Sequence, residues 1–136
     1  YGPTQKKIEA LIVNLKLKKN IKILPFQSNP YPFIKKSQLF ILSSKYEGLP
    51  NSLLEAIVLN KPVISSNCPS GPNEILDKGK GGLLFTIGDY KSLANKIEYF
   101  IKSKNQMIQK KKYARKRLNR FDYKLRLHDY YKAICS

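Results

Sequence analysis

Short apolar runs that alternate with helical patterns constrain the fold of this chain more than any other feature. Each run is rich in strand-forming side chains and is followed by residues whose apolar members recur at helical spacing. Strands that are joined through helices pair in parallel, with right-handed crossovers and helices on both faces of the sheet. The sequence therefore predicts an α/β fold with a parallel sheet flanked by helices. The expected strands are Ile21–Leu24, Leu39–Leu42, Pro62–Ser65 and Leu83–Thr86.

The expected helices lie between and after these strands. The first extends from Pro3 to about Lys19, with an apolar stripe on one face. Its stripe consists of Ile8, Leu11, Ile12 and Leu15. The others are a short helix after a Pro-broken turn at Asn29–Pro32, a helix that carries Glu55 and ends near Asn60, a helical turn at Asn73–Leu76, and three final segments that include C-terminal helices within 105–136.

Two glutamates flank the turn between the second expected strand and the next helix. Glu47 lies on the turn and Glu55 about one turn into the helix, which Pro50 and Asn51 open, with the Asn51 side chain available to accept a bond from a free backbone N–H. The N-terminus of a helix can hold a diphosphate, and carboxylates accept hydrogen bonds from sugar hydroxyls. Two simpler interpretations stay open: Glu55 stabilises its own helix dipole, and Glu47 is a solvated turn residue.

A second loop follows the next strand and belongs to the same edge of the sheet. Ligands of parallel sheets bind beyond the carboxyl ends of the strands, which is where both Glu47 and the Cys68–Glu74 segment lie. Ser70, Gly71 and Glu74 are therefore candidate ligand contacts, although Ser-Gly-Pro and an early-turn acid are also ordinary chemistry for opening a helix. Tyr31 is a candidate contact for the nucleotide base, with packing as the alternative, and Lys45 is a candidate contact for phosphate, with simple exposure as the alternative. His128 is predicted to be structural or exposed.

The turn and its neighbours resemble the retaining GT-B glycosyltransferases of family four. Glu47 and Glu55, with Gly48-Leu49-Pro50 between them, match the E-x7-E motif of that family. The resemblance covers nearly the whole chain and is strongest to the branch that builds lipopolysaccharide, capsule and other surface glycans. The other matching segments are Asn29-Pro30-Tyr31-Pro32-Phe33, Leu39 to Ser44, Lys61 to Ser65, Cys68 to Leu76, Gly82 to Phe85 and Gly88-Asp89.

This resemblance implies a function and a set of residue roles. It implies transfer of a hexosyl or N-acetylhexosaminyl group from a nucleotide diphosphate sugar, with UDP favoured over GDP and with retention of the anomeric configuration. No metal or other cofactor is expected. The acceptor would be a glycan or a lipid-linked sugar. Glu47 would contact the donor sugar at the catalytic centre, and Glu55 would contact the ribose. The remaining donor-binding residues would be Gly48, Leu49, Pro50, Asn51, Ser70 and Gly71.

The chain is expected to be one part of a two-domain enzyme. Its 136 residues suit a single domain, whereas the family uses two Rossmann-like halves. By resemblance, residues 1–136 form the donor-binding C-terminal domain, incomplete at its N-terminus and lacking the acceptor domain. The Arg and Lys pair that stabilises the leaving diphosphate in the family would precede Tyr1, so this chain is expected not to turn over alone.

The formal net charge of +17 is extreme for one domain, and Lys supplies 22 of the 26 basic residues. One interpretation is attraction to an anionic membrane, worth about 1 kcal/mol per basic residue near the surface. The other is a biased composition whose charges are simply solvated. The densest run is predicted to be an exposed helix face and consists of Lys110-Lys111-Lys112, Arg115, Lys116, Arg117 and Arg120.

Alternative functions are a basic module that binds nucleic acid or membrane, and a GT-B nucleotide-sugar epimerase. Nucleic acid is an unlikely partner because Tyr113 is the one aromatic residue within the basic run. Cys68 and Cys135 form no disulfide framework, which suits a reducing compartment. The expected location is therefore the cytoplasm, at the inner face of the membrane if the charge is functional.

Overall fold

The computed structural model describes residues 2, 4–125 and 127, which divide between two compact units, Tyr1–Pro30 and Tyr31–Ser136. The first unit contains helix α1 (Gln5–Asn14). This helix is shorter than predicted because the chain turns into the left-handed region at Lys16 (φ 57°), where the Leu17 N–H bonds the Ile12 carbonyl. Of the predicted stripe, only Ile12 is buried.

The predicted strand at Ile21–Leu24 is wrong. These residues pair with no strand in the described part of the chain, and the side chains of Ile21, Ile23 and Leu24 are 40–44% exposed. A strand depends on a neighbouring backbone to complete its hydrogen bonds, so strand-forming side chains alone do not produce one.

Within the described residues, the second unit contains a parallel sheet of three strands in the order β1-β2-β3. The strands are β1 (Phe40–Leu42), β2 (Val63–Ser66) and β3 (Leu83–Phe85), each within a residue of its prediction. Phe40 lies opposite Val63, and Ile64 lies opposite Leu83. The predicted α/β architecture with a parallel sheet is confirmed.

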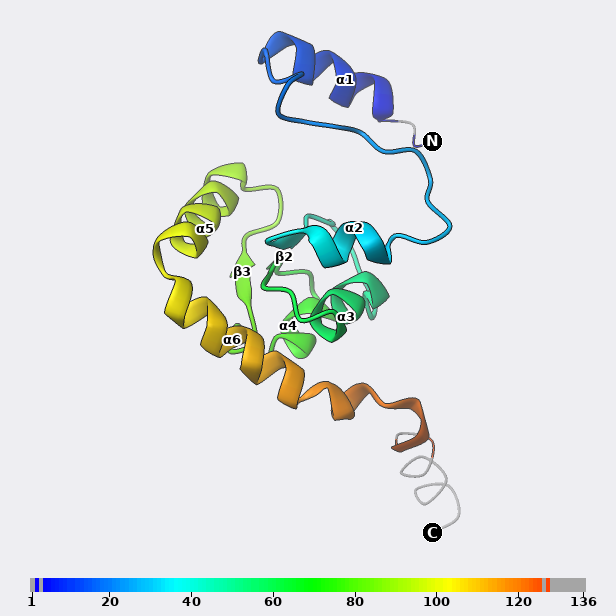
Figure 1. Cartoon of the computed structure of the whole chain (residues 1–136), viewed down its shortest axis with the longest axis vertical. Coiled ribbons are helices and arrows are strands. Elements are labelled where there is room, and N and C mark those ends of the chain that lie inside the picture. Colours follow the sequence, from blue (N-terminus) through cyan, green and yellow to red (C-terminus); the bar gives the residue numbers. More distant parts are fainter. Residues whose placement is uncertain (1, 3, 126, 128–136) are drawn as a thin grey trace. The chain divides into compact units, whose positions relative to one another are not determined.

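Helices cover both faces of the sheet in the second unit (Figure 1). Helix α3 packs against β1 and β2, and α5 packs against β3. Helix α2 begins at Tyr31, so Pro32 lies in the first turn of the helix and not in the preceding turn that the sequence predicted. The missing N–H of Pro32 costs no hydrogen bond in a first turn. The helices are α2 (Tyr31–Lys36), α3 (Asn51–Val58), α4 (Pro72–Ile75), α5 (Tyr90–Lys102), α6 (Lys104–Lys116) and the 3-10 helix η1 (Leu118–Phe121).

The core lies on the two faces of β2, all four residues of which are buried. One cluster joins Val63 to the inner faces of α3, α4 and α6, and the other joins Ile64 to β3 and Met107. Helix α3 ends where Asn60 takes a left-handed conformation (φ 61°) and the Lys61 N–H bonds the Ala56 carbonyl, which directs the chain straight into β2.

Truncation of the α3 core residue should destabilise this unit. Leu53 is fully buried, so Leu53→Ala should lower the free energy of unfolding by about 2–5 kcal/mol through lost burial and a cavity. Val58 on the same helix is 57% exposed, and Val58→Ala should cost much less. Urea denaturation of both variants measures the difference, and equal losses would contradict this packing.

Candidate functional site

The loops that follow β1 and β2 are joined by hydrogen bonds at one edge of the sheet. Ser66, the last residue of β2, donates from Oγ to the Ser44 carbonyl at 2.6 Å. The Cys68 thiol donates to the same carbonyl at 3.3 Å. Ser66 and Cys68 are both buried, so the end of β2 fixes the start of the loop that carries Glu47.

Glu47 is held in place through both its side chain and its backbone. The Ser44 hydroxyl donates to the Glu47 carboxylate at 2.6 Å, and the Ser70 hydroxyl donates to the Glu47 carbonyl at 2.7 Å. Glu47 is half-buried. A carboxylate has about four lone-pair acceptor sites, and the Ser44 hydroxyl uses one of them, so the group can still accept hydrogen bonds from a polyol.

Gly71 makes the closest contact between the two loops. A Cβ atom at this position would lie 1.9 Å from the Gly48 carbonyl oxygen and 2.7 Å from Cδ of Pro50. Gly71 also has a φ of +79°, which disfavours any other residue. The glycine therefore allows the loop after β2 to lie directly against the turn that opens α3.

Helix α3 opens differently from the prediction. Pro50 is the cap residue, Asn51 is already the first helical residue, and no side chain caps the helix. The predicted capping role of Asn51 is wrong, because the Pro50 carbonyl accepts the first bond, from the Leu53 N–H at 3.1 Å. The N–H groups of Asn51 and Ser52 precede that bond and carry the positive end of the helix dipole.

A pocket of about 360 Å³ lies beside Glu55. The Tyr31 hydroxyl donates to the Glu55 carboxylate at 3.5 Å, so the aromatic ring and the carboxylate lie together at the pocket. Glu55 is the fifth residue of α3, and the first turn has no acidic residue, which weakens the interpretation that Glu55 serves the helix dipole. The lining residues are Tyr31, Asn51, Leu54, Glu55, Val58 and Leu59.

The structure assembles most of the predicted residues but not all of them. Ser70 and Gly71 join the Glu47 turn, and Asn51 shares the pocket with Glu55, whereas Glu47 is not among the residues that line it. Leu49 is half exposed near the turn. Lys45 and Glu74 are exposed, and His128 and Cys135 lie outside the described residues. The sequence favoured packing as the role of Tyr31, and its hydrogen bond to Glu55 was not predicted.

Neither a metal cluster nor a membrane span is found in the part of the chain that the structure describes. No group of three or more His, Cys, Asp or Glu side chains is arranged there to hold a metal ion. No helix among those residues has the length and apolarity needed to cross a membrane.

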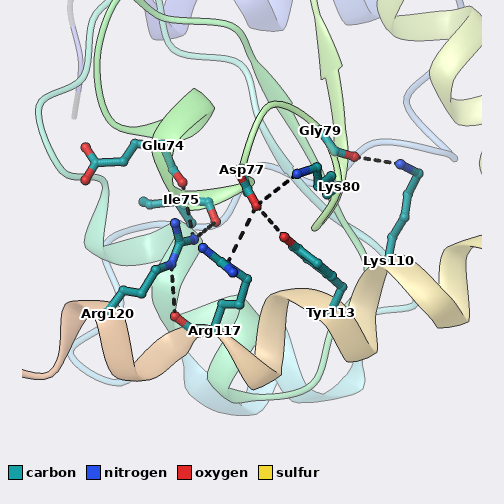
Figure 2. Close-up of polar contacts among 9 residues, drawn as sticks. All are labelled: Glu74, Ile75, Asp77, Gly79, Lys80, Lys110, Tyr113, Arg117 and Arg120. Carbon is teal, nitrogen blue, oxygen red and sulfur yellow. Dashed lines mark hydrogen bonds and ion pairs between the residues drawn. The ribbon is translucent and has the colours of Figure 1, made fainter.

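A left-handed turn after α4 forms a second cluster, which the sequence analysis missed (Figure 2). Asp77, Lys78 and Gly79 have φ angles of 47°, 54° and 89°. Tyr113 of α6 donates its hydroxyl to the Asp77 carboxylate, and Lys80 and Arg117 each form an ion pair with it at 3.7 Å. The Gly-rich sequence around Asp77 was the available signal, but it does not reveal the partners on α6.

Two more basic side chains bind the carbonyl groups of this segment (Figure 2). Lys110 donates to the Gly79 carbonyl at 2.6 Å, and Arg120 donates to the carbonyls of Glu74 and Ile75 at 3.4 and 3.2 Å. Burial, followed by repulsion from Lys96, lowers the pKa of Lys110. The prediction that the whole basic run is an exposed helix face is therefore wrong for Lys110, Arg117 and Arg120.

The fold and the paired loops agree with a family comparison. Residues 1–117 match the model of the family described as glycosyl transferases group 1, which includes the whole edge that carries Glu47, Glu55 and Gly71. The chain belongs to this family. The predicted resemblance to GT-B glycosyltransferases is confirmed.

Two related proteins are named as transferases that act on a diphospho-undecaprenol-linked sugar and on lipopolysaccharide. The chain is 26% identical over 121 residues to the N-acetylgalactosamine-N,N'-diacetylbacillosaminyl-diphospho-undecaprenol 4-alpha-N-acetylgalactosaminyltransferase of Campylobacter jejuni, covering 89% of this chain and 33% of that protein. It is 34% identical over 91 residues to the lipopolysaccharide 1,6-galactosyltransferase of Salmonella typhimurium, covering 64% of this chain and 25% of that protein. The chain thus spans a third or less of the length of these relatives.

A solved structure has the same fold. Anabaena HepE, determined in complex with UDP, superposes with a TM-score of 0.86 over 96% of this glycosyltransferase chain and 36% of the HepE chain, at 23% sequence identity. At this identity the likeness shows the fold alone. The α/β arrangement therefore corresponds to about a third of a GT-B enzyme chain.

Substitution of Gly71 should separate the two loops of the candidate site. Gly71→Ala should lower the free energy of unfolding by roughly 2 kcal/mol or more, because the new methyl group overlaps the Gly48 carbonyl and the left-handed φ disfavours alanine. Gly48→Ala is the control, since a Cβ there meets nothing within 4 Å. Thermal unfolding compares the two, and an equally stable Gly71→Ala protein would contradict the close contact.

The Asp77 cluster should make stability depend on pH in the acid range. The hydrogen bond from Tyr113, together with the charges of Lys80, Arg117 and Arg120, lowers the pKa of Asp77 below its ordinary value of 3.8, against the opposing effect of desolvation. A lowered pKa in the folded state gives stability that is present above pH 3.8 and is lost as the pH falls through the folded-state pKa.

Asp77→Asn should remove this pH-dependent part of the stability. Urea unfolding at a series of pH values from neutral to acid should show a smaller acid loss in Asp77→Asn than in the unsubstituted chain. Glu98→Gln, which removes an exposed carboxylate from α5, is the matched control and should keep the full acid loss. Parallel pH profiles for the unsubstituted chain and Asp77→Asn would count against the Asp77 interactions.

Proposed function

We propose that this chain holds the nucleotide-sugar donor of a retaining glycosyltransferase that acts on surface glycan precursors. The observation that carries the proposal is the paired arrangement at one edge of the sheet. Three features follow one another there along the chain. They are the hydrogen-bonded Glu47, the N-terminus of α3 without a capping side chain, and the pocket beside Glu55 and Tyr31.

The three parts of the donor would bind to three successive groups. The sugar hydroxyls would donate to Glu47, whose carboxylate is oriented by Ser44. The diphosphate would lie against the N–H groups at the start of α3, where the partial positive charge of the helix favours an anion. The Gly48–Asn51 backbone and the Ser70–Gly71 loop form the walls of this position.

The nucleoside would occupy the pocket beside Glu55. Ribose hydroxyls can donate to the Glu55 carboxylate, which accepts from Tyr31 only over a long 3.5 Å contact and so has further capacity as an acceptor. The exposed Tyr31 ring offers an apolar face to the base or ribose. UDP is the favoured nucleotide, which is supported by the UDP bound to the structural neighbour HepE.

The chemistry would be transfer of a hexosyl or N-acetylhexosaminyl group with retention of configuration, without a metal ion. Positive dipoles and basic groups aimed at the diphosphate would stabilise the charge that develops on it. The acceptor would be a glycan or a lipid-linked sugar, as the names of the Campylobacter and Salmonella relatives suggest for those proteins. A cytoplasmic location, close to a membrane-bound acceptor, follows from the same proposal.

Donor binding should depend on Glu55. Glu55→Gln keeps the size of the side chain but removes its charge, and it should weaken UDP binding roughly tenfold or more because charge-assisted hydrogen bonds to the ribose are lost. Saturation-transfer NMR with UDP, GDP and UDP-glucose measures the affinity and shows which protons lie against the protein. Glu98→Gln, an equal change on α5, should leave the affinity unchanged.

The same experiment separates specific binding from general attraction to positive charge. UDP signals that are concentrated on the ribose in the unsubstituted chain, together with an affinity that is roughly tenfold or more lower in Glu55→Gln, support the proposal. Equal signals from every anion, insensitive to Glu55 and displaced by a single-stranded oligonucleotide, would overturn it. We expect the chain to bind the donor without transferring its sugar, so turnover of UDP-glucose by this chain alone would contradict the assignment of a donor-binding part.

A further inference from the structure

A basic pocket on α6 lies outside the candidate donor site. It has a volume of about 340 Å³ and combines one face of α6 with the turn after α4. Gln109, Lys112, Tyr113 and Lys116 follow the spacing that places side chains on one face of a helix. The lining residues, which define the α6 basic pocket, are Lys80, Gln109, Lys110, Lys112, Tyr113 and Lys116.

The α6 basic pocket has an excess of positive charge that its surroundings do not neutralise. Helix α6 contains no acidic residue. The carboxylate of Asp77 already accepts the Tyr113 hydroxyl and pairs with Arg117 as well as Lys80. Lys112 and Lys116 are exposed and form no hydrogen bond or ion pair within the described residues. These two ammonium groups are therefore available for an external anion.

The composition of the pocket favours phosphate groups presented by a surface. Lysine ammonium groups bind phosphate as point charges and do not impose the fixed fork geometry of arginine. Ile108, one turn before Lys112 on the same helix, is 42% exposed and adds an apolar contact. An array of anionic lipid headgroups can bind such lysine ammonium groups, since the electrostatic attraction between them depends on proximity rather than on a fixed geometry.

The pocket is less suited to single-stranded nucleic acid. That class of ligand uses exposed aromatic rings on which bases stack. Tyr113 is the one aromatic residue in the lining, and its ring is half-buried with the Arg117 guanidinium 5.6 Å from the ring centroid. Its hydroxyl is bonded to Asp77. The ring is therefore not free to act as a stacking platform.

We infer that the α6 basic pocket binds the phosphate headgroups of anionic phospholipids and attaches this domain to a membrane surface. The inference does not depend on donor binding, because the residues of the pocket are separate from Glu47 and Glu55. It assigns a function to Lys112 and Lys116 in particular, whereas Lys110 and Lys80 also hold the Asp77 turn.

Vesicle co-sedimentation tests the inference with variants that differ only in where charge is removed. The probes are phosphatidylcholine vesicles with and without phosphatidylglycerol. Lys112→Gln/Lys116→Gln removes the two available ammonium groups. Lys18→Gln/Lys19→Gln, in the unit that contains α1, removes the same charge from exposed positions elsewhere and is the matched control. Thermal unfolding establishes that both variants fold.

The expected result is binding to the phosphatidylglycerol vesicles alone, weakened roughly tenfold or more in Lys112→Gln/Lys116→Gln and much less in the control. Equal weakening in both variants would overturn the inference, because net charge rather than the pocket would then govern binding. Unchanged binding in the pocket variant would overturn it too. Loss of single-stranded oligonucleotide binding with vesicle binding retained would assign the pocket to nucleic acid instead.

Discussion

The contact between Gly71 and the Gly48 carbonyl holds together the two loops from which the candidate donor site is built. No side chain can be accommodated between them, because even a methyl group would lie 1.9 Å from the carbonyl oxygen. The Ser70 hydroxyl adds a bond to the Glu47 carbonyl next to this contact. The position of Glu47 relative to the start of α3 thus depends on a residue without a side chain and on its left-handed backbone.

The C-terminal part of the described chain supports this edge from a distance. Arg120 binds the carbonyls at the end of α4, and Tyr113, Lys110 and Arg117 hold the turn that follows it. Helix α4 is a single turn that begins directly after Gly71, so a short helical segment lies between that loop and the carbonyls that Arg120 binds. The segment that α6 holds is therefore continuous in the chain with the loop that carries Ser70 and Gly71.

The large positive charge serves more than one purpose. Some basic side chains bind backbone carbonyls or Asp77 and contribute to folding, and among these burial lowers the pKa of Lys110. Others, such as Lys112 and Lys116, remain exposed on the same helix. Composition alone cannot separate these groups, since a lysine that bonds a carbonyl and one that faces solvent contribute equally to the net charge.

The sequence by itself determined the three strands of the sheet and their parallel pairing, because short apolar runs between helices depend on local pattern. The family followed from the resemblance of several sequence motifs, among them Glu47 and Glu55. It also placed Ser70 and Gly71 at the correct edge. Only the tertiary structure decided that Ile21–Leu24 is not a strand, that α3 begins at Asn51 without a capping side chain, that Tyr31 contacts Glu55, and that α6 binds the Asp77 turn. Each of these depends on which backbone or side chain lies opposite in space, and that information is not contained in the periodicity of a single segment.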